Sequence, residues 1–177
     1  MGMVKKSIDI VLMGQPSLYQ KSISIEEIDN DVKNMIAAMR IVLEQKKAVG
    51  LAAPQIGYNR RIILFGFADN ARYPDQAPIP ITTLINPEYA VIGSAVASDW
   101  EGCLSVPGIR GLVERYKTIK YWGLDENGNP ISAIAEGFLA RIIQHEIDHL
   151  DGIIFPFRVR DLKYLAFESV ITSIANN

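Results

Sequence analysis

The chain has 177 residues, of which 49% are apolar and 21% are charged. This composition is typical of a folded globular protein and excludes a disordered tail or a fibrous repeat, and the length predicts one domain over residues 1–177. Lysine and arginine total 18 against 20 aspartate and glutamate residues, which argues against nucleic-acid binding by general neutralisation of phosphates.

The sequence predicts neither membrane insertion nor export. The longest uncharged stretches, 48–59 and 76–87, are each 12 residues long, whereas a helix that spans a bilayer needs about 20 largely apolar residues. Residues 1–9 break their apolar run with a charge and lack the cleavage site of a signal peptide. We therefore expect a cytoplasmic protein in which the single cysteine, Cys103, remains a reduced thiol.

The first elements are predicted from turns, caps and apolar spacing. Residues 8–12 indicate a strand, followed by a turn at 14–16. Residues 24–27 have the spacing of a capping box, and apolar residues then recur every three or four positions as far as Val42. This pattern predicts a long amphipathic helix that begins at the box, with Ser24 as its cap, and ends near Lys46.

The middle of the chain is predicted to form β-structure. After a loop at residues 50–57, the apolar run 61–67 indicates a strand, and a proline-rich loop precedes another strand at 82–85. Residues 119–124 and 131–135 flank a turn rich in Asp, Asn and Gly, which predicts a β-hairpin.

Two more helices are predicted toward the C-terminus. Helix-forming residues run from 137 to 150, and Gly152 suits the left-handed position that follows a helix. Residues 161–174 repeat apolar side chains at helical spacing, which predicts a C-terminal helix.

His145 and His149 are the first indication of chemistry. They lie four positions apart, with Glu146 following the first, and residues i and i+4 share one helix face, so both imidazoles can bind one metal ion. The alternative is a pair of ordinary core or surface histidines. Because a catalytic metal site commonly has three protein ligands and an open position for water, a third ligand is expected.

Two residues are candidates for the third ligand, and they imply different enzymes. Glu168 lies 19 residues after His149, near the spacing of a helical glutamate ligand in some metalloproteases, and its alternative role is an ordinary solvated charge. Cys103 follows Gly102, and a thiolate is a strong ligand for zinc or ferrous iron. Its alternative role is a small buried apolar side chain. The residues favour Cys103 without excluding Glu168.

Three segments resemble the signature motifs of peptide deformylases, in the same order and with similar spacing. They are GLAAPQIG at 50–57, EGCLS at 101–105 and QHEIDHL at 144–150. The resemblance implies an α+β fold, with short mixed or antiparallel sheets packed around a central metal-binding helix and with a C-terminal helix. It also implies a single catalytic domain that removes the N-formyl group from the initiator formyl-methionine of nascent polypeptides, in the cytoplasm of a bacterium rather than in an organelle.

The same resemblance implies the site. Cys103, His145 and His149 would be the ligands of one divalent metal ion, for which Fe²⁺ is favoured and Zn²⁺, Ni²⁺ or Co²⁺ are substitutes. Glu146 would be the general base that takes a proton from water and passes it to the leaving amine.

Stabilisation of the oxyanion is implied for the side-chain amide of Gln55 and the backbone N–H of Leu104. The alternative for Gln55 is a loop amide that binds backbone groups. The substrate would pair as an extra strand with Val49 and Gly50, where the glycine permits close approach.

Other side chains would complete the site. Phe138 and Ile142 lie one helical turn apart and would form the wall of an apolar pocket for methionine, a role compatible with core packing. Asp148 would orient a ligand or bind a neighbouring group, and Glu101 would pair with Arg115 to brace the Cys103 loop.

The C-terminal segment departs from the many deformylases that dock a basic helix on the ribosome. It has Arg158, Arg160 and Lys163 near its start, then Glu168 and no further positive charge. The sequence therefore predicts at most weak ribosome docking through this helix. The long terminal helix and the proline-rich insert resemble the Gram-negative and organellar branch of the family.

Two rival functions are weighed against deformylation. One is a metalloprotease that uses Glu168 as its third ligand, and the other is a non-catalytic peptide- or ribosome-binding relative with a structural metal. The presence of Glu146 and Gln55 argues against the second, because a structural site needs neither a base nor an oxyanion donor.

Overall fold

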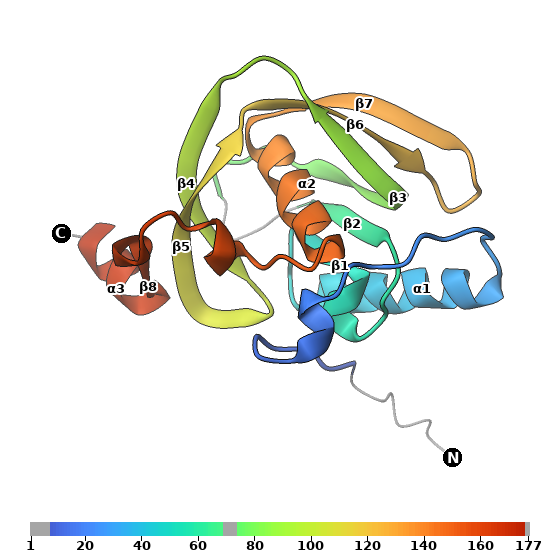
Figure 1. The fold of residues 1–177 in the computed structure, drawn as a ribbon, viewed down its shortest axis with the longest axis horizontal. Helices are drawn as coiled ribbons and strands as arrows, with labels where there is room; N and C mark the ends of the chain where they lie inside the picture. The colour runs from blue at the N-terminus through green and yellow to red at the C-terminus, as the bar shows by residue number, and fades with distance from the viewer. Residues whose placement is uncertain (1–7, 69–73, 176–177) are drawn as a thin grey trace.

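The structure is a computed structural model that describes residues 8–68 and 74–175. Two antiparallel sheets flank one central helix, and a second long helix covers part of the larger sheet (Figure 1). The α+β class and the central helix therefore agree with the prediction. Parallel pairing in the described part of the chain is limited to one isolated bridge, between Ile23 and Arg60.

The larger sheet has five strands in the order β1-β2-β3-β6-β7. Their bounds are β1 Gly50–Ala52, β2 Ile62–Phe67, β3 Ile79–Val91, β6 Thr118–Leu124 and β7 Pro130–Glu136. Every residue of β2 is buried, as expected for an apolar run in the middle of a sheet covered on both faces. The predicted β6–β7 hairpin is confirmed, with Thr118 opposite Glu136 and Leu124 opposite Pro130.

The smaller sheet has three strands in the order β4-β5-β8, namely β4 Val96–Cys103, β5 Val106–Tyr116 and β8 Leu165–Phe167. The long β4–β5 hairpin was not predicted from the sequence. Its register places Glu101 opposite Gly111 and Gly102 opposite Arg110. This hairpin carries the EGCLS motif at its tip and along β4.

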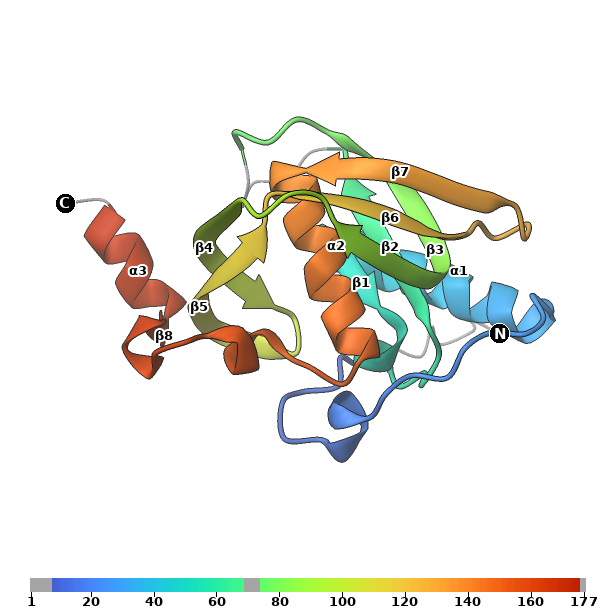
Figure 2. The ribbon, with the colours of Figure 1, turned by 45° about the horizontal axis from the view of Figure 1, so that its top comes forward.

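The central helix, α2, spans Gly137–Leu150 as predicted. It stands between the two sheets, with β4 and β5 on one side and β1 to β3 on the other (Figure 2). Its core-facing residues pack with Ile63, Phe65 and Leu84 of the larger sheet. Gly152, at φ +75°, lets the chain leave the helix in the left-handed conformation.

The first long helix, α1, spans Asn30–Gln45, and its predicted start was wrong. The cap is Asp29, whose Oδ1 accepts the N–H of Val32 at 2.9 Å. The segment with capping-box spacing is not helical, because the N–H and C=O of Ile25 are both bound by the side chain of Asn86. Spacing alone did not reveal this distant partner.

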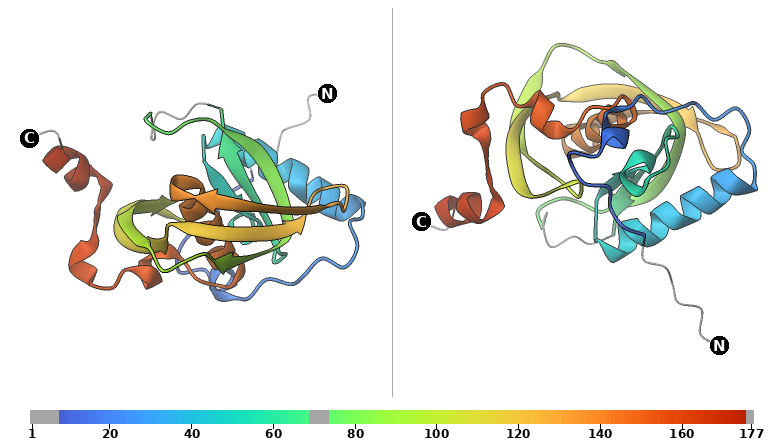
Figure 3. Two further views of the ribbon diagram at one scale, coloured as in Figure 1. Left: turned by 90° about the horizontal axis from the view of Figure 1, so that it is seen from above. Right: turned by 60° about the horizontal axis from the view of Figure 1, so that its bottom comes forward.

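The expected strand at residues 8–12 is absent, because this segment is extended but forms no ladder. Instead, the N–H of Val11 donates to the C=O of Gln55 at 2.8 Å, and the N–H of Met13 donates to the C=O of Ser105 at 2.7 Å. Figure 3 shows the segment crossing the lower side of the molecule. It therefore supports the loops that follow β1 and β4.

The C-terminal helix predicted over residues 161–174 is correct only in its second half. Leu162–Tyr164 is a 3₁₀ turn, β8 follows, and α3 spans Glu168–Ala175. β8 pairs with residues 109–111 of β5 and forms an edge of the smaller sheet. The shorter 3₁₀ turns are Pro16–Tyr19, Ala53–Ile56 and Phe155–Arg158. None of the described helices is long and apolar enough to cross a bilayer.

Candidate active site

Cys103, His145 and His149 converge on one point between β4 and α2. One ligand atom from each residue lies within 4.8 Å of the others, and Cys103 Sγ is 3.2 Å from His149 Nε2. The two histidines extend from successive turns of α2, whereas the cysteine ends β4. A thiolate and two imidazoles are a donor set that suits zinc or ferrous iron, so this cluster could hold a divalent metal ion.

Glu168 is placed elsewhere. Its Oε1 accepts hydrogen bonds from Nε and Nη2 of Arg110, at 2.9 and 2.6 Å. Among the described residues, the metal-ligating cluster consists of the cysteine and the two histidines. The structure therefore places Cys103, and not Glu168, with the histidines.

The electrostatics of the cluster favour a thiolate. Burial acts to raise the pKa of Cys103, but the charge of His149 and hydrogen bonds with both histidines outweigh burial and hold the pKa well below its ordinary value. Burial acts to lower the pKa of His145, but its hydrogen bonds with Cys103 and Glu101 raise that pKa well above its ordinary value. A metal ion bound by these residues would take the place of the proton that an imidazole otherwise shares with the thiolate.

Glu146 lies against the backbone of β1. The Cβ of an alanine at Gly50 would fall 2.3 Å from Glu146 Oε1, so the glycine makes room for the carboxyl group. The other oxygen, Oε2, is buried and has no hydrogen-bond partner in the described part of the chain. Burial raises the pKa of Glu146 to about 7, against the opposing charges of His145 and His149.

Gln55 occupies the 3₁₀ turn after β1 and is fixed at both ends of its amide. Its Oε1 accepts the N–H of Ala52 at 2.8 Å, while its Nε2 is 3.3 Å from Cys103 Sγ and 3.4 Å from Ser105 Oγ. The alternative role foreseen for this residue, binding of loop backbone, is therefore present. Because the amide oxygen is bound to the backbone, the NH₂ group of Gln55 is turned toward Cys103.

A cavity of about 290 Å³ opens beside these groups. It is lined by the predicted site residues Val49, Gly50, Gln55, Cys103, Leu104, Phe138, Ile142, His145 and Glu146, among others. Arg110 and Glu168 also line it. The residues proposed for substrate binding and those proposed for chemistry thus face one space.

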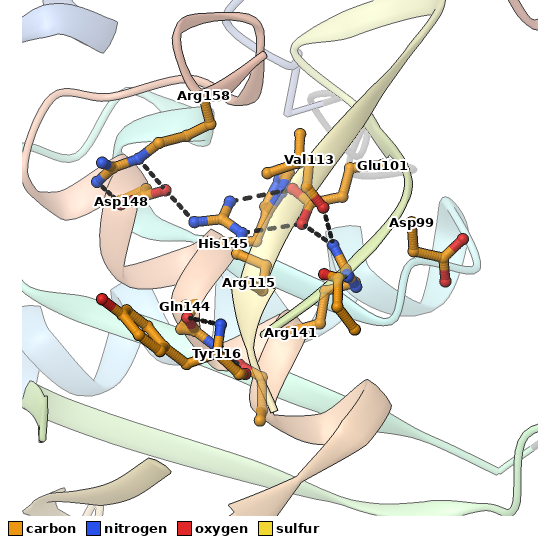
Figure 4. Close-up of polar contacts among 12 residues, drawn as sticks. Asp99, Glu101, Val113, Arg115, Tyr116, Arg141, Gln144, His145, Asp148 and Arg158 are labelled. Carbon is orange, nitrogen blue, oxygen red and sulfur yellow. Dashed lines mark hydrogen bonds and ion pairs between the residues drawn. The ribbon is translucent and has the colours of Figure 1, made fainter. Parts of the chain in front are cut away.

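A buried network of charges lies behind His145 (Figure 4). Glu101 Oε2 is 2.9 Å from His145 Nδ1, and Arg115 donates to both oxygens of Glu101 at 2.9 and 3.0 Å. Burial acts to raise the pKa of Glu101, but hydrogen bonds from His145 and Arg115 hold it far below its usual range. The expected Glu101–Arg115 pair is confirmed.

Asp148 extends the same network. Its Oδ2 accepts from Arg115 at 2.5 Å, and it also accepts two hydrogen bonds from Arg158. Despite the cost of burying Arg115, the bonds and charges of Glu101 and Asp148 raise its pKa further. Asp148 thus binds two arginines rather than a metal ligand.

The matches to known proteins agree with this geometry. The family model described as polypeptide deformylase matches residues 7–164. This chain belongs to the polypeptide deformylase family. It is therefore a hydrolase that acts on the N-formyl group of peptides that begin with formyl-methionine.

Relatives and solved structures cover most of the chain. Peptide deformylase 1 of Bordetella pertussis is 44% identical over 163 residues, 92% of this chain and 93% of its own length. Peptide deformylase 2 of Ralstonia nicotianae is 42% identical over 92% of each chain. A class I type b peptide deformylase from Acinetobacter baumannii with bound Met-Ala-Ser is 34% identical and superposes with a TM-score of 0.82, over 86% of this chain and 98% of that one.

Proposed function

We propose that this enzyme releases formate from formyl-methionine peptides by means of a metal ion held by Cys103, His145 and His149. The observation that carries the proposal is the meeting of these three donors beside a cavity that is lined by Cys103 and His145 together with Glu146 and Gln55. A metal ion bound in such a set lowers the pKa of water and polarises a carbonyl group.

The native ion is proposed to be Fe²⁺. The thiolate and imidazole donors suit both ferrous iron and zinc, and the resemblance to deformylases favours iron. Metal analysis of protein purified without oxygen tests the choice. A fully active protein that contains zinc alone would overturn it.

Glu146 is proposed to transfer a proton from the attacking water to the leaving amine. Its unpartnered Oε2 is a free acceptor inside the cavity wall, and a pKa near 7 suits a group that both accepts and releases a proton at neutral pH. Glu146 Oε2 would take the proton of the attacking water and deliver it to the leaving amine nitrogen.

Gln55 and Leu104 are proposed to bind the oxyanion that forms when the formyl carbon is attacked. Because Gln55 Oε1 is held by Ala52, Nε2 is the end that faces the cavity. Leu104 follows the cysteine and lines the same cavity, so its backbone N–H is the second proposed donor. Each such donor typically contributes about 10²–10³ in rate.

The peptide is proposed to lie along Val49 and Gly50, with its methionine side chain against Phe138 and Ile142. β1 is an edge strand of the larger sheet, so its outer side can accept an added strand. Met-Ala-Ser, which is bound to the Acinetobacter protein, has the sequence that deformylation of such a substrate would leave.

The rival protease reading is tested by two variants. The deformylase assignment predicts that Cys103→Ala loses the metal and Glu168→Ala keeps it, measured as metal per protein after gel filtration. The reverse pattern would support Glu168 as the third ligand and overturn the assignment.

We propose that the enzyme is cytoplasmic and that its C-terminal helix contributes little to docking on the ribosome. Arg158 and Arg160 are paired with Asp148 and Glu114, and α3 itself carries no lysine or arginine. Electrostatic attraction of α3 to ribosomal RNA is therefore expected to be weak.

A further inference from the structure

Arg141 is a buried cation on α2 that the sequence analysis did not single out. It lies one helical turn before His145, and only 8% of its surface is exposed. Together with Phe138, Ile142 and His145 it lines the cavity from one face of the helix. A charged residue beside the apolar Phe138 and Ile142 needs an explanation, because burying a charge is costly unless it is fully paired.

The guanidinium group of Arg141 makes three hydrogen bonds to the smaller sheet. Nη1 donates to Glu101 Oε1 at 2.8 Å and to the C=O of Val113 at 2.9 Å, and Nη2 donates to the C=O of Ala97 at 2.7 Å. Figure 4 shows its head group on the side of Glu101 away from Asp148. The planar fork of arginine donates from two separate nitrogens in a fixed geometry, whereas lysine donates from a single nitrogen.

These bonds complete the acceptor positions of Glu101. Oε1 receives Arg115 and Arg141, while Oε2 receives Arg115 and His145. Three N–H donors from the two arginines occupy both oxygens of Glu101 and hold the carboxyl group in one orientation, so it presents an acceptor to His145 Nδ1. His145 must then carry its proton on Nδ1, which leaves the Nε2 lone pair for a metal ion.

We propose that Arg141 is a positioning residue that acts through Glu101 to fix the ring orientation and tautomer of the metal ligand His145. The role deepens the proposed function and rests on it, since it takes His145 as a ligand. It explains why a pocket for an apolar side chain contains an arginine in its wall. Arg141 lines the cavity, while its head group donates hydrogen bonds to Glu101 and to two backbone carbonyl groups.

Co²⁺ is the probe for the test, because its visible absorption reports ligand geometry and a chelator competition gives its dissociation constant without any substrate. Arg141→Met retains an unbranched apolar stem but loses the head group. We expect Co²⁺ to bind about 10–100-fold more weakly to this variant, with an altered spectrum. Arg141→Lys should recover part of the loss, since one donor to Glu101 is restored.

Arg158→Met is the matched control. It removes a guanidinium group from the same network, but one that binds Asp148 and not Glu101, so Co²⁺ affinity should change much less. Unchanged affinity and spectrum in Arg141→Met, or equal losses in Arg158→Met, would overturn the proposal, even if the melting temperature fell. If Arg141→Met does not fold, wild-type affinity and spectrum in Arg141→Lys would overturn it.

The test separates this role from the function itself. Weaker Co²⁺ binding in Arg141→Met together with no formate release by the wild type would sustain the positioning role and reject the reaction. Formate release by the wild type together with unaffected Co²⁺ binding in Arg141→Met would support the reaction and reject the positioning role.

Discussion

At Gly50 the backbone of β1 comes so close to Glu146 that no side chain fits between them. A Cβ there would meet Oε1 at 2.3 Å, Cδ at 2.8 Å and Cγ at 2.9 Å. The sequence suggested that this glycine admits the substrate backbone. In the structure the carboxyl group already needs the space, so the residue first of all places the proposed base.

Gly50→Ala should therefore impair catalysis through Glu146. A methyl group would displace the carboxyl group by about 1 Å, and such a misplacement can cost about 10² in rate. We expect kcat for a formyl-Met peptide to fall by roughly this factor with metal content unchanged. Full activity in this variant would show that Glu146 does not act from its observed position.

Glu101 is the residue whose charge the buried network depends on. Glu101→Gln would leave Arg141 and part of Arg115 without a countercharge, and breaking a buried pair in this way costs about 3–5 kcal/mol. We expect that loss of unfolding free energy at neutral pH, measured by urea unfolding with a chelator present so that both proteins are metal-free. A loss below about 1 kcal/mol would contradict the account of the network.

The same residue predicts a dependence on pH. Because folding lowers the pKa of Glu101 from its ordinary 4.5, its stabilisation is fully present above that pH and is lost as the pH falls below it. The stability difference between wild type and Glu101→Gln should therefore shrink as the pH is lowered from 5 toward 3. A difference that stays constant over this range would show that ionisation of Glu101 is not its source.

Among the elements, α1 offers a direct comparison of two possible caps. The structure assigns the cap to Asp29, whose carboxylate accepts the N–H of Val32, whereas Ser24 lies in the extended segment before it. Asp29→Ala should lower the free energy of unfolding by about 0.5–2 kcal/mol, and Ser24→Ala should change it by much less. If urea unfolding showed equal losses of free energy for the two variants, the assignment of the cap to Asp29 would be contradicted.

Elements with a local pattern were predicted well, and those with distant partners were not. The helix over residues 137–150 shows its periodicity and its terminating glycine within one stretch of chain. By contrast, residues 165–167 have helical spacing but pair with β5, more than fifty positions earlier. The β4–β5 hairpin was missed because its glycines and charged residues obscure the alternation of a strand.

At the scale of the whole molecule, the site combines residues from α2 with residues from both sheets. The i and i+4 spacing predicted the two histidines, because both ligands lie on one helix. The proposed third ligand, Cys103, ends β4, and only the tertiary arrangement distinguishes it from Glu168. Arg141 had a visible signal, a charge four positions before His145, but its partner Glu101 is distant in sequence.

Substrate selectivity should follow from the shape of the cavity. A formyl carbon carries only hydrogen, whereas an acetyl group adds a methyl that would press on the wall near Leu104 and Gln55. Overpacking of this kind costs about 1–3 kcal/mol, or roughly 5- to 150-fold in rate. We expect kcat/KM to be roughly 5- to 150-fold lower for acetyl-Met peptides than for formyl-Met peptides, or lower still. Equal cleavage of the two kinds of peptide would contradict the assignment.

The methionine side chain should also matter. Replacing it with alanine removes most of an apolar group whose burial is worth about 1.5–3 kcal/mol. Formyl-Ala peptides should therefore show a kcat/KM at least about tenfold lower than formyl-Met peptides. Equal values would place the first side chain outside the pocket of Phe138 and Ile142.

The most direct test is formate release from a formyl-Met peptide by metal-loaded protein, with Glu146→Ala assayed alongside. The account predicts release that disappears when the metal is removed. It also predicts that the variant keeps its metal but is slower by about 10²–10⁴, as expected for loss of a general acid–base group. Undiminished release by the variant, or cleavage of internal peptide bonds in place of formate release, would contradict it.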